Sequence, residues 1–174
     1  MYFGGTAKEW KEVQINSGNE YLKKANIYYN CTSVPGEIQS IELTSLPNKL
    51  QYVENIGGLK LGGGILTVYY EDDVTQELDL ELLDKNIISG YDMSKTGCQV
   101  LTVTYKGYTT EFSITVFKNG DINGDGNVNA SDIVMSITNL LNNYTNSERY
   151  DVNHDGLFNI LDFIYLKKKA VGIV

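Results

Sequence analysis

The chain has 174 residues, 42% of them hydrophobic, and a formal net charge of −8 at pH 7, so it has room for one domain or two small ones. This acidic balance argues against a nucleic-acid partner and an anionic membrane surface, both of which attract basic faces. No apolar run approaches the roughly 20 residues that span a bilayer, so we expect no membrane insertion.

The only histidine of the chain is His154, which nearly excludes Ser-His-Asp catalysis and a histidine-rich zinc site. A carboxylate-pair hydrolase stays formally open, but no feature selects such a pair, and we expect no enzyme.

Residues 1–33 form the first of three predicted segments and are too few to bury a core by themselves. We expect extended chain at 13–15 and 27–29, with a helix start at 17–20 and about one helical turn after it. The segment resembles the closing end of a leucine-rich-repeat array of bacterial surface proteins, which implies a short terminal repeat cap. That resemblance rests on Gly5-Thr6, Glu9-Trp10, Ser17-Gly18-Asn19-Glu20 and Tyr28-Tyr29-Asn30. The alternative is an irregular extension that packs on the next domain.

Residues 34–118 read as strands separated by turn signals such as Gly62-Gly63-Gly64 and Lys106-Gly107. Apolar, β-branched or aromatic runs lie at 38–43, 65–70, 77–83, 99–105 and 110–117. Some seven short strands in this length suit a β-sandwich. The segment resembles a bacterial Ig-like domain, on the strength of residues 64–70, 88–92 and 97–105. Such domains mostly serve as spacers or adhesion modules.

The cysteines and the tyrosines leave alternatives open. The spacing of Cys31 and Cys98 fits no metal site. They could pair in an oxidising compartment, but we favour two partly buried thiols. Tyrosines could stack sugar rings in an exposed row and give a polysaccharide contact. We favour the simpler reason that tyrosine has a high strand propensity. The tyrosines concerned are Tyr69, Tyr70, Tyr91, Tyr105 and Tyr108.

Two windows of equal length, 121–132 and 151–162, repeat one pattern. They are identical at positions 1, 3, 5, 6, 9 and 12, where a calcium loop needs oxygen ligands and a glycine for its sharp turn. Each window gathers three aspartates, which repel one another until a cation binds. Oxygen ligands on a flexible loop favour Ca²⁺ over Mg²⁺. The repeat therefore predicts two calcium loops.

Each loop is expected to be followed by a helix, but no helix enters the first loop, because residues 111–117 read as strand. The first helix carries one predicted apolar stripe: Ile133, Val134, Ile137, Leu140 and Leu141. We predict the second helix from Phe163 to about Ala170, with basic residues near its C-terminus. Position 8 is apolar in both copies, Val128 and Phe158, which is consistent with loops that pack side by side.

This pair of loop-helix units, with aspartate at position 12 and a linker at 142–150, resembles a dockerin, covering residues 119–174. Dockerins bind cohesin domains on scaffold or cell-surface proteins of fibre-degrading bacteria. The resemblance implies two calcium ions. The implied ligands of the first ion are Asp121, Asn123, Asp125, Asn127, Asn129 and Asp132. Those of the second are Asp151, Asn153, Asp155, Leu157, Asn159 and Asp162.

The resemblance also implies the residues that contact a cohesin, at loop positions 10 and 11 and at a later helical site. In the first copy these are Ala130, Ser131, Ile137 and Thr138, and in the second Ile160, Leu161, Lys167 and Lys168. One face is small and weakly polar, whereas the other joins an apolar pair to a basic cluster. We therefore expect a single binding orientation and favour the second copy. The alternative is that Ile160 and Leu161 cover the dockerin's own core.

The sequence thus predicts a multidomain chain: a short leucine-rich-repeat cap (1–33), an Ig-like β-sandwich (34–118) and a small all-α calcium-binding dockerin (119–174). We expect a secreted protein, on the cell surface or in a cellulosome. A calcium-switched sensor is disfavoured by the missing entry helix. A carbohydrate-binding or adhesive protein that its dockerin merely tethers remains an alternative.

Overall fold

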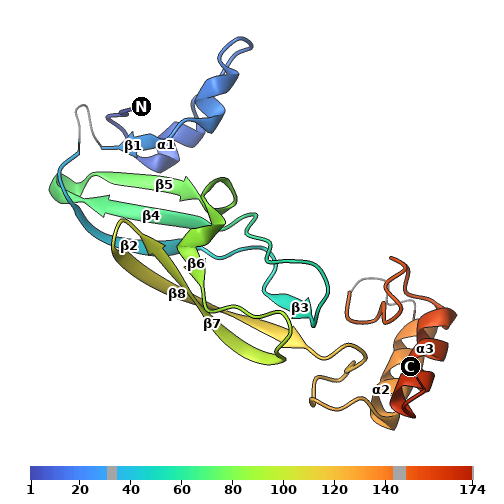
Figure 1. Cartoon of the computed structure of the whole chain (residues 1–174). Helices are drawn as coiled ribbons and strands as arrows, with labels where there is room; N and C mark the ends of the chain where they lie inside the picture. The colour runs from blue at the N-terminus through green and yellow to red at the C-terminus, as the bar shows by residue number, and fades with distance from the viewer. Residues whose placement is uncertain (31–34, 143–147, 174) are drawn as a thin grey trace. The chain divides into compact units, whose positions relative to one another are not determined.

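The structure is a computed structural model that describes residues 1–30, 35–142 and 148–173 (Figure 1). The chain divides into two compact units. The first consists of Met1–Lys49, Lys60–Ser89 and Leu101–Phe112, and the second of Leu50–Leu59, Gly90–Val100 and Ser113–Val174. Among the described helices none has the length and apolar character that crossing a bilayer requires. The domain boundaries after residues 33 and 118 remain predictions.

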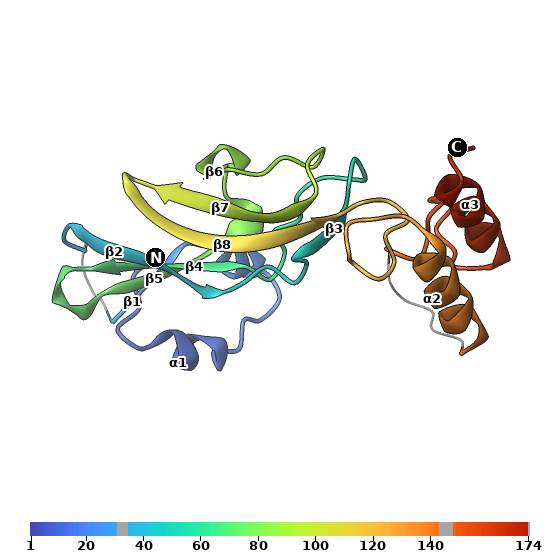
Figure 2. The same cartoon turned by 90° about the horizontal axis from the view of Figure 1, so that it is seen from below.

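The described strands form two four-stranded sheets (Figure 2). The first sheet has the order β1 (Ile27–Tyr29), β5 (Thr75–Asp79), β4 (Ile65–Tyr70) and β2 (Ile38–Ser45). All of its neighbouring strands are antiparallel. The second sheet has the order β3 (Gln51–Val53), β8 (Tyr108–Phe117), β7 (Gly97–Tyr105) and β6 (Ile88–Ser89). In this sheet β3 runs parallel to β8.

Alternation along the strands places one side of each sheet in the core. In β8 the side chains of Phe112, Ile114 and Val116 are buried, whereas Glu111 and Ser113, which alternate with them, are exposed. This confirms the period-two pattern of residues 111–116, since neighbouring side chains of a strand point to opposite faces. In β5 and β7 the alternating residues Leu78, Leu101 and Val103 are buried. In β4 Leu66, Thr67 and Val68 are all buried, so this strand is covered on both faces.

The structure has seven strands, β2 to β8, in the described part of residues 34–118, as the sequence predicts. One prediction is displaced, because β5 ends at Asp79 and does not reach residue 83. Residues Leu80–Leu82 form the 3₁₀ helix η3 in its place, where Asp79 accepts a hydrogen bond from the N–H of Glu81 at 2.9 Å. Local capping by a short acidic side chain thus ends the strand. Two further single-turn 3₁₀ helices are η2 (Glu71–Asp73) and η4 (Lys85–Ile87).

The N-terminal segment contains a helix that the sequence analysis missed, α1 (Ala7–Lys11). Thr6 and Glu9 form a capping box: the Glu9 carboxylate accepts from the Thr6 N–H at 2.7 Å, and the Thr6 hydroxyl accepts from the Glu9 N–H. This Thr-x-x-Glu spacing is a signal that could have revealed the helix. The expected helical turn is confirmed as η1 (Glu20–Lys24), whereas the described residues 13–15 form no strand.

Strand β1 is the link between this segment and the first sheet, since it pairs with β5. On the other side of β1, Tyr28 forms a parallel bridge with Tyr2, near the start of the chain. Backbone N–H groups of Phe3 and Tyr28 donate across this bridge at 2.8 and 2.9 Å. Helix α1 and the 3₁₀ helix η1 lie between these two bridged residues in the chain.

The structure corrects the expectation for the cysteines. Cys98 is exposed and free, not partly buried, because it lies on the outward side near the start of β7. Cys31 lies outside the described residues. Four of the five tyrosines lie in strands, whereas Tyr91 does not. Tyr70 is only 5% exposed and donates to the side chain of Gln76 at 2.8 Å. With Tyr70 in the core, the five tyrosines do not form one exposed row.

Candidate metal centre

Both predicted loops lead into a helix whose first turn is the end of the loop. Helix α2 spans Ala130–Leu141 and α3 spans Ile160–Ala170. Each is capped by the asparagine at loop position 9, whose side-chain oxygen accepts from the N–H two residues later at 2.8 Å. The prediction that the second helix begins at Phe163 is therefore wrong, because it begins at Ile160. A side-chain cap at position 9 makes position 10 the first helical residue.

The aspartate at position 12 closes each loop. Oδ2 of Asp132 accepts from the Asn129 N–H at 2.8 Å, and Oδ2 of Asp162 accepts from the Asn159 N–H at the same distance. The other oxygen of Asp132 accepts from the N–H groups of Ile122 and Asn123, at 2.8 and 3.0 Å. Both carboxylates are 0% exposed. Position 12 thus caps the helix and also ties the end of the loop to its beginning.

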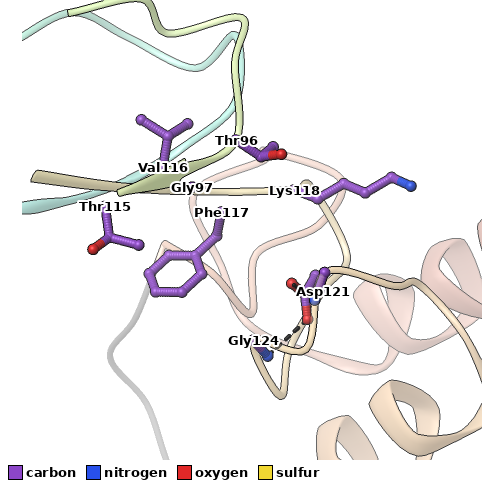
Figure 3. Close-up of a pocket in the computed structure, with 9 residues that line it drawn as sticks. Thr96, Gly97, Thr115, Val116, Phe117, Lys118, Asp121 and Gly124 are labelled. Carbon is purple, nitrogen blue, oxygen red and sulfur yellow. Dashed lines mark hydrogen bonds between the residues drawn. The ribbon is translucent and has the colours of Figure 1, made fainter. Parts of the chain in front are cut away.

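The aspartate at position 1 gathers the middle of the loop around itself. Asp121 accepts from the N–H groups of Gly124, Asp125 and Gly126 at 2.7 to 3.1 Å; Figure 3 shows the bond to Gly124. Asp151 accepts in the same way from Asp155 and Gly156. The glycines at position 6 have φ of 87° and 88°, a left-handed conformation that favours glycine. The repeated glycine is therefore required by the turn.

Positions 3 and 5 interact in both loops. The side-chain amide of Asn123 donates to Asp125 at 2.8 Å, and that of Asn153 donates to Asp155 at 3.0 Å. The hydrogen bond from Asn123, followed by one from the N–H of Asn127, lowers the pKa of Asp125. A lowered pKa keeps the carboxylate ionised, which is the form that binds a cation.

The donor chemistry of the loops fits a hard cation. The partners that the structure gives Asp121, Asp132 and Asp162 are backbone N–H groups, and all three carboxylates are buried. Buried negative charges of this kind are stabilised when a cation joins them. The described residues contain no group of three or more His, Cys, Asp or Glu side chains that could hold a metal by themselves. Half of the predicted donor positions are asparagine or backbone oxygens, so the ligand set is not an acid cluster.

Asp121 and two of its glycine partners also border a pocket of about 160 Å³ (Figure 3). The rest of the lining comes from the end of β8 and the residue after it, Thr115 to Lys118, and from Thr96 and Gly97. Position 1 of the first loop therefore has a concave surface beside it.

A small core holds the two loop-helix copies of the repeat together. Ile122 and Val152, at position 2 of each loop, are buried with Leu166 of α3, and Val128, Ile133 and Tyr150 pack against them.

The prediction of one apolar stripe on the first helix needs correction. Val134, Ile137 and Leu141 are 62%, 36% and 76% exposed, whereas the buried positions of α2 are Asp132 and Ser136. The helix is apolar on more than one face, and its inner face is the one that carries the loop carboxylate.

The predicted docking residues are all exposed. This holds for Ala130, Ser131, Ile137, Thr138, Ile160, Leu161, Lys167 and Lys168. Ile160 and Leu161 are 52% and 54% exposed, so the alternative that they cover the dockerin's own core is wrong. The predicted docking residues left out four further exposed apolar residues in equivalent positions of the two helices: Val134 with Ile164, and Met135 with Tyr165. The signal was available, because each helix carries more apolar residues than one buried face needs.

Comparison with known proteins agrees with this architecture. Residues 119–169 match the family model of the dockerin type I domain, and residues 57–116 match that of the bacterial Ig-like domain (group 3). One solved structure, "Solution structure of a putative surface protein", is 35% identical in sequence and covers 49% of this chain and 92% of that chain, with a TM-score of 0.30. The comparison with curated proteins gives no match.

Proposed function

Because the chain carries a dockerin type I domain preceded by a bacterial Ig-like domain, we propose that it is a non-catalytic docking module. In this proposal residues 119–174 bind a cohesin domain in a calcium-dependent way and anchor the parent protein to a scaffold or cell-surface assembly. The Ig-like domain serves as a spacer. We further propose that the protein acts outside the cell, on its surface or in a cellulosome.

The observation that carries this proposal is the repetition of one hydrogen-bond network in the two loops. Position 12 accepts from position 9 in both, position 1 accepts from positions 5 and 6, and position 5 accepts from position 3. Two loops with the same ligand types and the same internal bonds support two equivalent calcium sites, held by the twelve predicted positions. Calcium, when bound, supplies positive charge among six aspartates.

The docking surface is proposed to lie on the helices that the loops cap. The side chains at positions 10 and 11 occupy the first helical turn, so the shape of this surface depends on loop closure. We propose that the second copy makes the main contact, because Ile160 and Leu161 are exposed apolar side chains next to the basic run of Lys167 and Lys168.

We also propose that the segment 1–33 is a terminal leucine-rich-repeat cap. The support is the parallel bridge between Tyr2 and Tyr28, because the stretch from one tyrosine to the other has the length of such a repeat, about 20–29 residues. Helix α1 lies between the two bridged residues, which is consistent with a repeat that joins an extended piece to a helix.

A pull-down of the chain with a panel of cohesin domains tests the proposed function. We expect capture by at least one cohesin in millimolar Ca²⁺ and none in EDTA. A variant with Asp121→Ala and Asp151→Ala should lose capture in both conditions. The matched control is Asp84→Ala, which removes an aspartate that caps a 3₁₀ helix outside the repeat and should leave capture unchanged. Capture that persists in EDTA, or in the double variant, would contradict calcium dependence.

A further inference from the structure

Two residues outside the calcium loops make contacts that cross from one loop to the other. Asn119 lies two residues before the first loop, and its side-chain amide donates to the carbonyl of Val152 in the second loop at 3.3 Å. The same amide nitrogen lies 2.9 Å from Nε2 of His154. Val152 and His154 occupy positions 2 and 4 of the second loop. The residue that introduces the first loop therefore contacts the beginning of the second.

Arg149 makes the reciprocal contact. It lies two residues before the second loop, and its Nε donates to the carbonyl of Asp121, position 1 of the first loop, at 2.9 Å. Its Nη2 lies against Gly124 at position 4, where a β-carbon would be only 2.6 Å away. The guanidinium carbon also lies 3.8 Å from the centre of the Phe117 ring, a cation–π distance. Phe117 is the last residue of β8.

The two contacts correspond under the internal repeat, since Asn119 and Arg149 each stand two residues before position 1 of their own loop. The residues at position 4 of the two loops differ in size, and this difference fits the two contacts. Gly124 leaves room for the guanidinium, whereas His154 extends a side chain toward the shorter Asn119. Each loop therefore presents position 4 to the entry residue of the other loop.

We infer that Asn119 and Arg149 are positioning residues that couple the two calcium loops. Closing the first loop fixes the chain around Asn119, which in turn holds the first positions of the second loop, and Arg149 acts in the opposite direction. A calcium ion bound in one loop thereby raises the affinity of the other, and the coupling is reciprocal. This inference rests on the proposed function in one respect, because it requires both loops to bind calcium.

The amide protons of Gly126 and Gly156 give a separate signal for each loop. Each donates to the position-1 aspartate of its own loop at 2.9 Å, so its chemical shift reports closure of that loop alone. The experiment is a Ca²⁺ titration of the ¹⁵N-labelled full chain, followed by NMR at these two amides. In the parent chain we expect both to shift over the same concentration range.

Asn119→Ala should move the Gly156 midpoint to about three- to tenfold higher Ca²⁺, as expected for the loss of one or two hydrogen bonds, and move the Gly126 midpoint less. Arg149→Ala should move the Gly126 midpoint to higher Ca²⁺ by the same factor and move the Gly156 midpoint less. Asn119→Asp and Arg149→Lys, which keep the size or the charge of the side chain, should reproduce the direction of each shift if an alanine variant does not fold. Lys118→Ala, next to Asn119 and exposed, is the matched control and should move neither midpoint.

The outcomes separate this inference from the proposed function. If both amides respond in the parent but each variant changes only the loop that it precedes, or changes neither, the crossed coupling is wrong while the calcium sites stand. If neither amide responds to Ca²⁺ in the parent chain, the calcium sites fail and the coupling fails with them.

Discussion

The carboxylate of Asp132 accepts a hydrogen bond from the backbone N–H of Ile122 at 2.8 Å, so the last position of the first loop is bonded to its second. Both residues are buried, at 0% and 2% exposed. The pair joins a charged ligand to the apolar core, because Ile122 is one of the three residues at the centre of that core. Loop closure and packing of the helices are therefore one event.

This relationship predicts that helix content depends on calcium. Without a cation the aspartates of each loop repel one another, and a buried carboxylate disfavours closure. In EDTA we expect the circular-dichroism signal of α2 and α3 to be lost, and in millimolar Ca²⁺ we expect it to return. Mg²⁺ at the same concentration is the control and should restore less of the signal. Equal helicity in EDTA and in Ca²⁺ would contradict the coupling of metal binding to folding.

Two leucines of α3 should differ in what their substitution changes: one should lower stability and the other should weaken binding. Leu166 is 0% exposed in the small core, so Leu166→Ala should lower the free energy of unfolding by about 2–5 kcal/mol. Leu161 is 54% exposed, so Leu161→Ala should change it by less than about 0.5 kcal/mol and yet weaken cohesin binding. Denaturant unfolding in saturating Ca²⁺ measures the first quantity, and calorimetric titration with the cohesin measures the second. Equal stability losses in the two variants would show that the assignment of buried and exposed faces is wrong.

The two docking faces can be compared directly. We expect Ile160→Asp with Leu161→Asp to abolish cohesin binding, because it places charges in the apolar part of the contact. Ala130→Asp with Ser131→Asp should leave the affinity near that of the parent. Both pairs lie at exposed positions in the first turn of a helix, so each double variant controls for the other. If both double variants bind like the parent, the two faces are interchangeable and the single orientation is wrong.

Because Tyr29 is buried, we expect the free energy of unfolding to fall in alkaline solution. Burial, and to a lesser extent the charge of Glu77, raises the pKa of Tyr29 from about 10 to about 12. The folded chain therefore holds the hydroxyl proton more tightly than the unfolded chain does. The stabilisation is complete below pH 10 and is lost as the pH rises from 10 to 12. Over this range the free energy of unfolding should depend less steeply on pH in Tyr29→Phe than in the parent. It should keep the parent's dependence in Tyr21→Phe, whose side chain is 67% exposed. The same pH dependence in Tyr29→Phe as in the parent would contradict this assignment.

The sequence by itself determined the features whose cause is local. A calcium loop sets its ligand spacing within one short window, so the two windows were readable from Asp, Asn and Gly alone. The alternation of residues 111–116 predicted β8 and its buried face, because side chains on a strand alternate between its two faces. The position-9 caps and the Thr6–Glu9 box were equally local, and the misplaced start of α3 and the missed α1 could have been avoided.

The tertiary structure decided what depends on partners that are distant in sequence. The pattern of α2 could not show that Val134 and Leu141 face outward while Ser136 is buried, because several faces of this helix are apolar. The pairing of β1 with β5 joins segments far apart in the chain and follows from the available sheet edge, not from either strand alone. The contacts of Asn119 and Arg149 arise only when two copies of the repeat fold against each other, because each residue binds the loop that it does not precede.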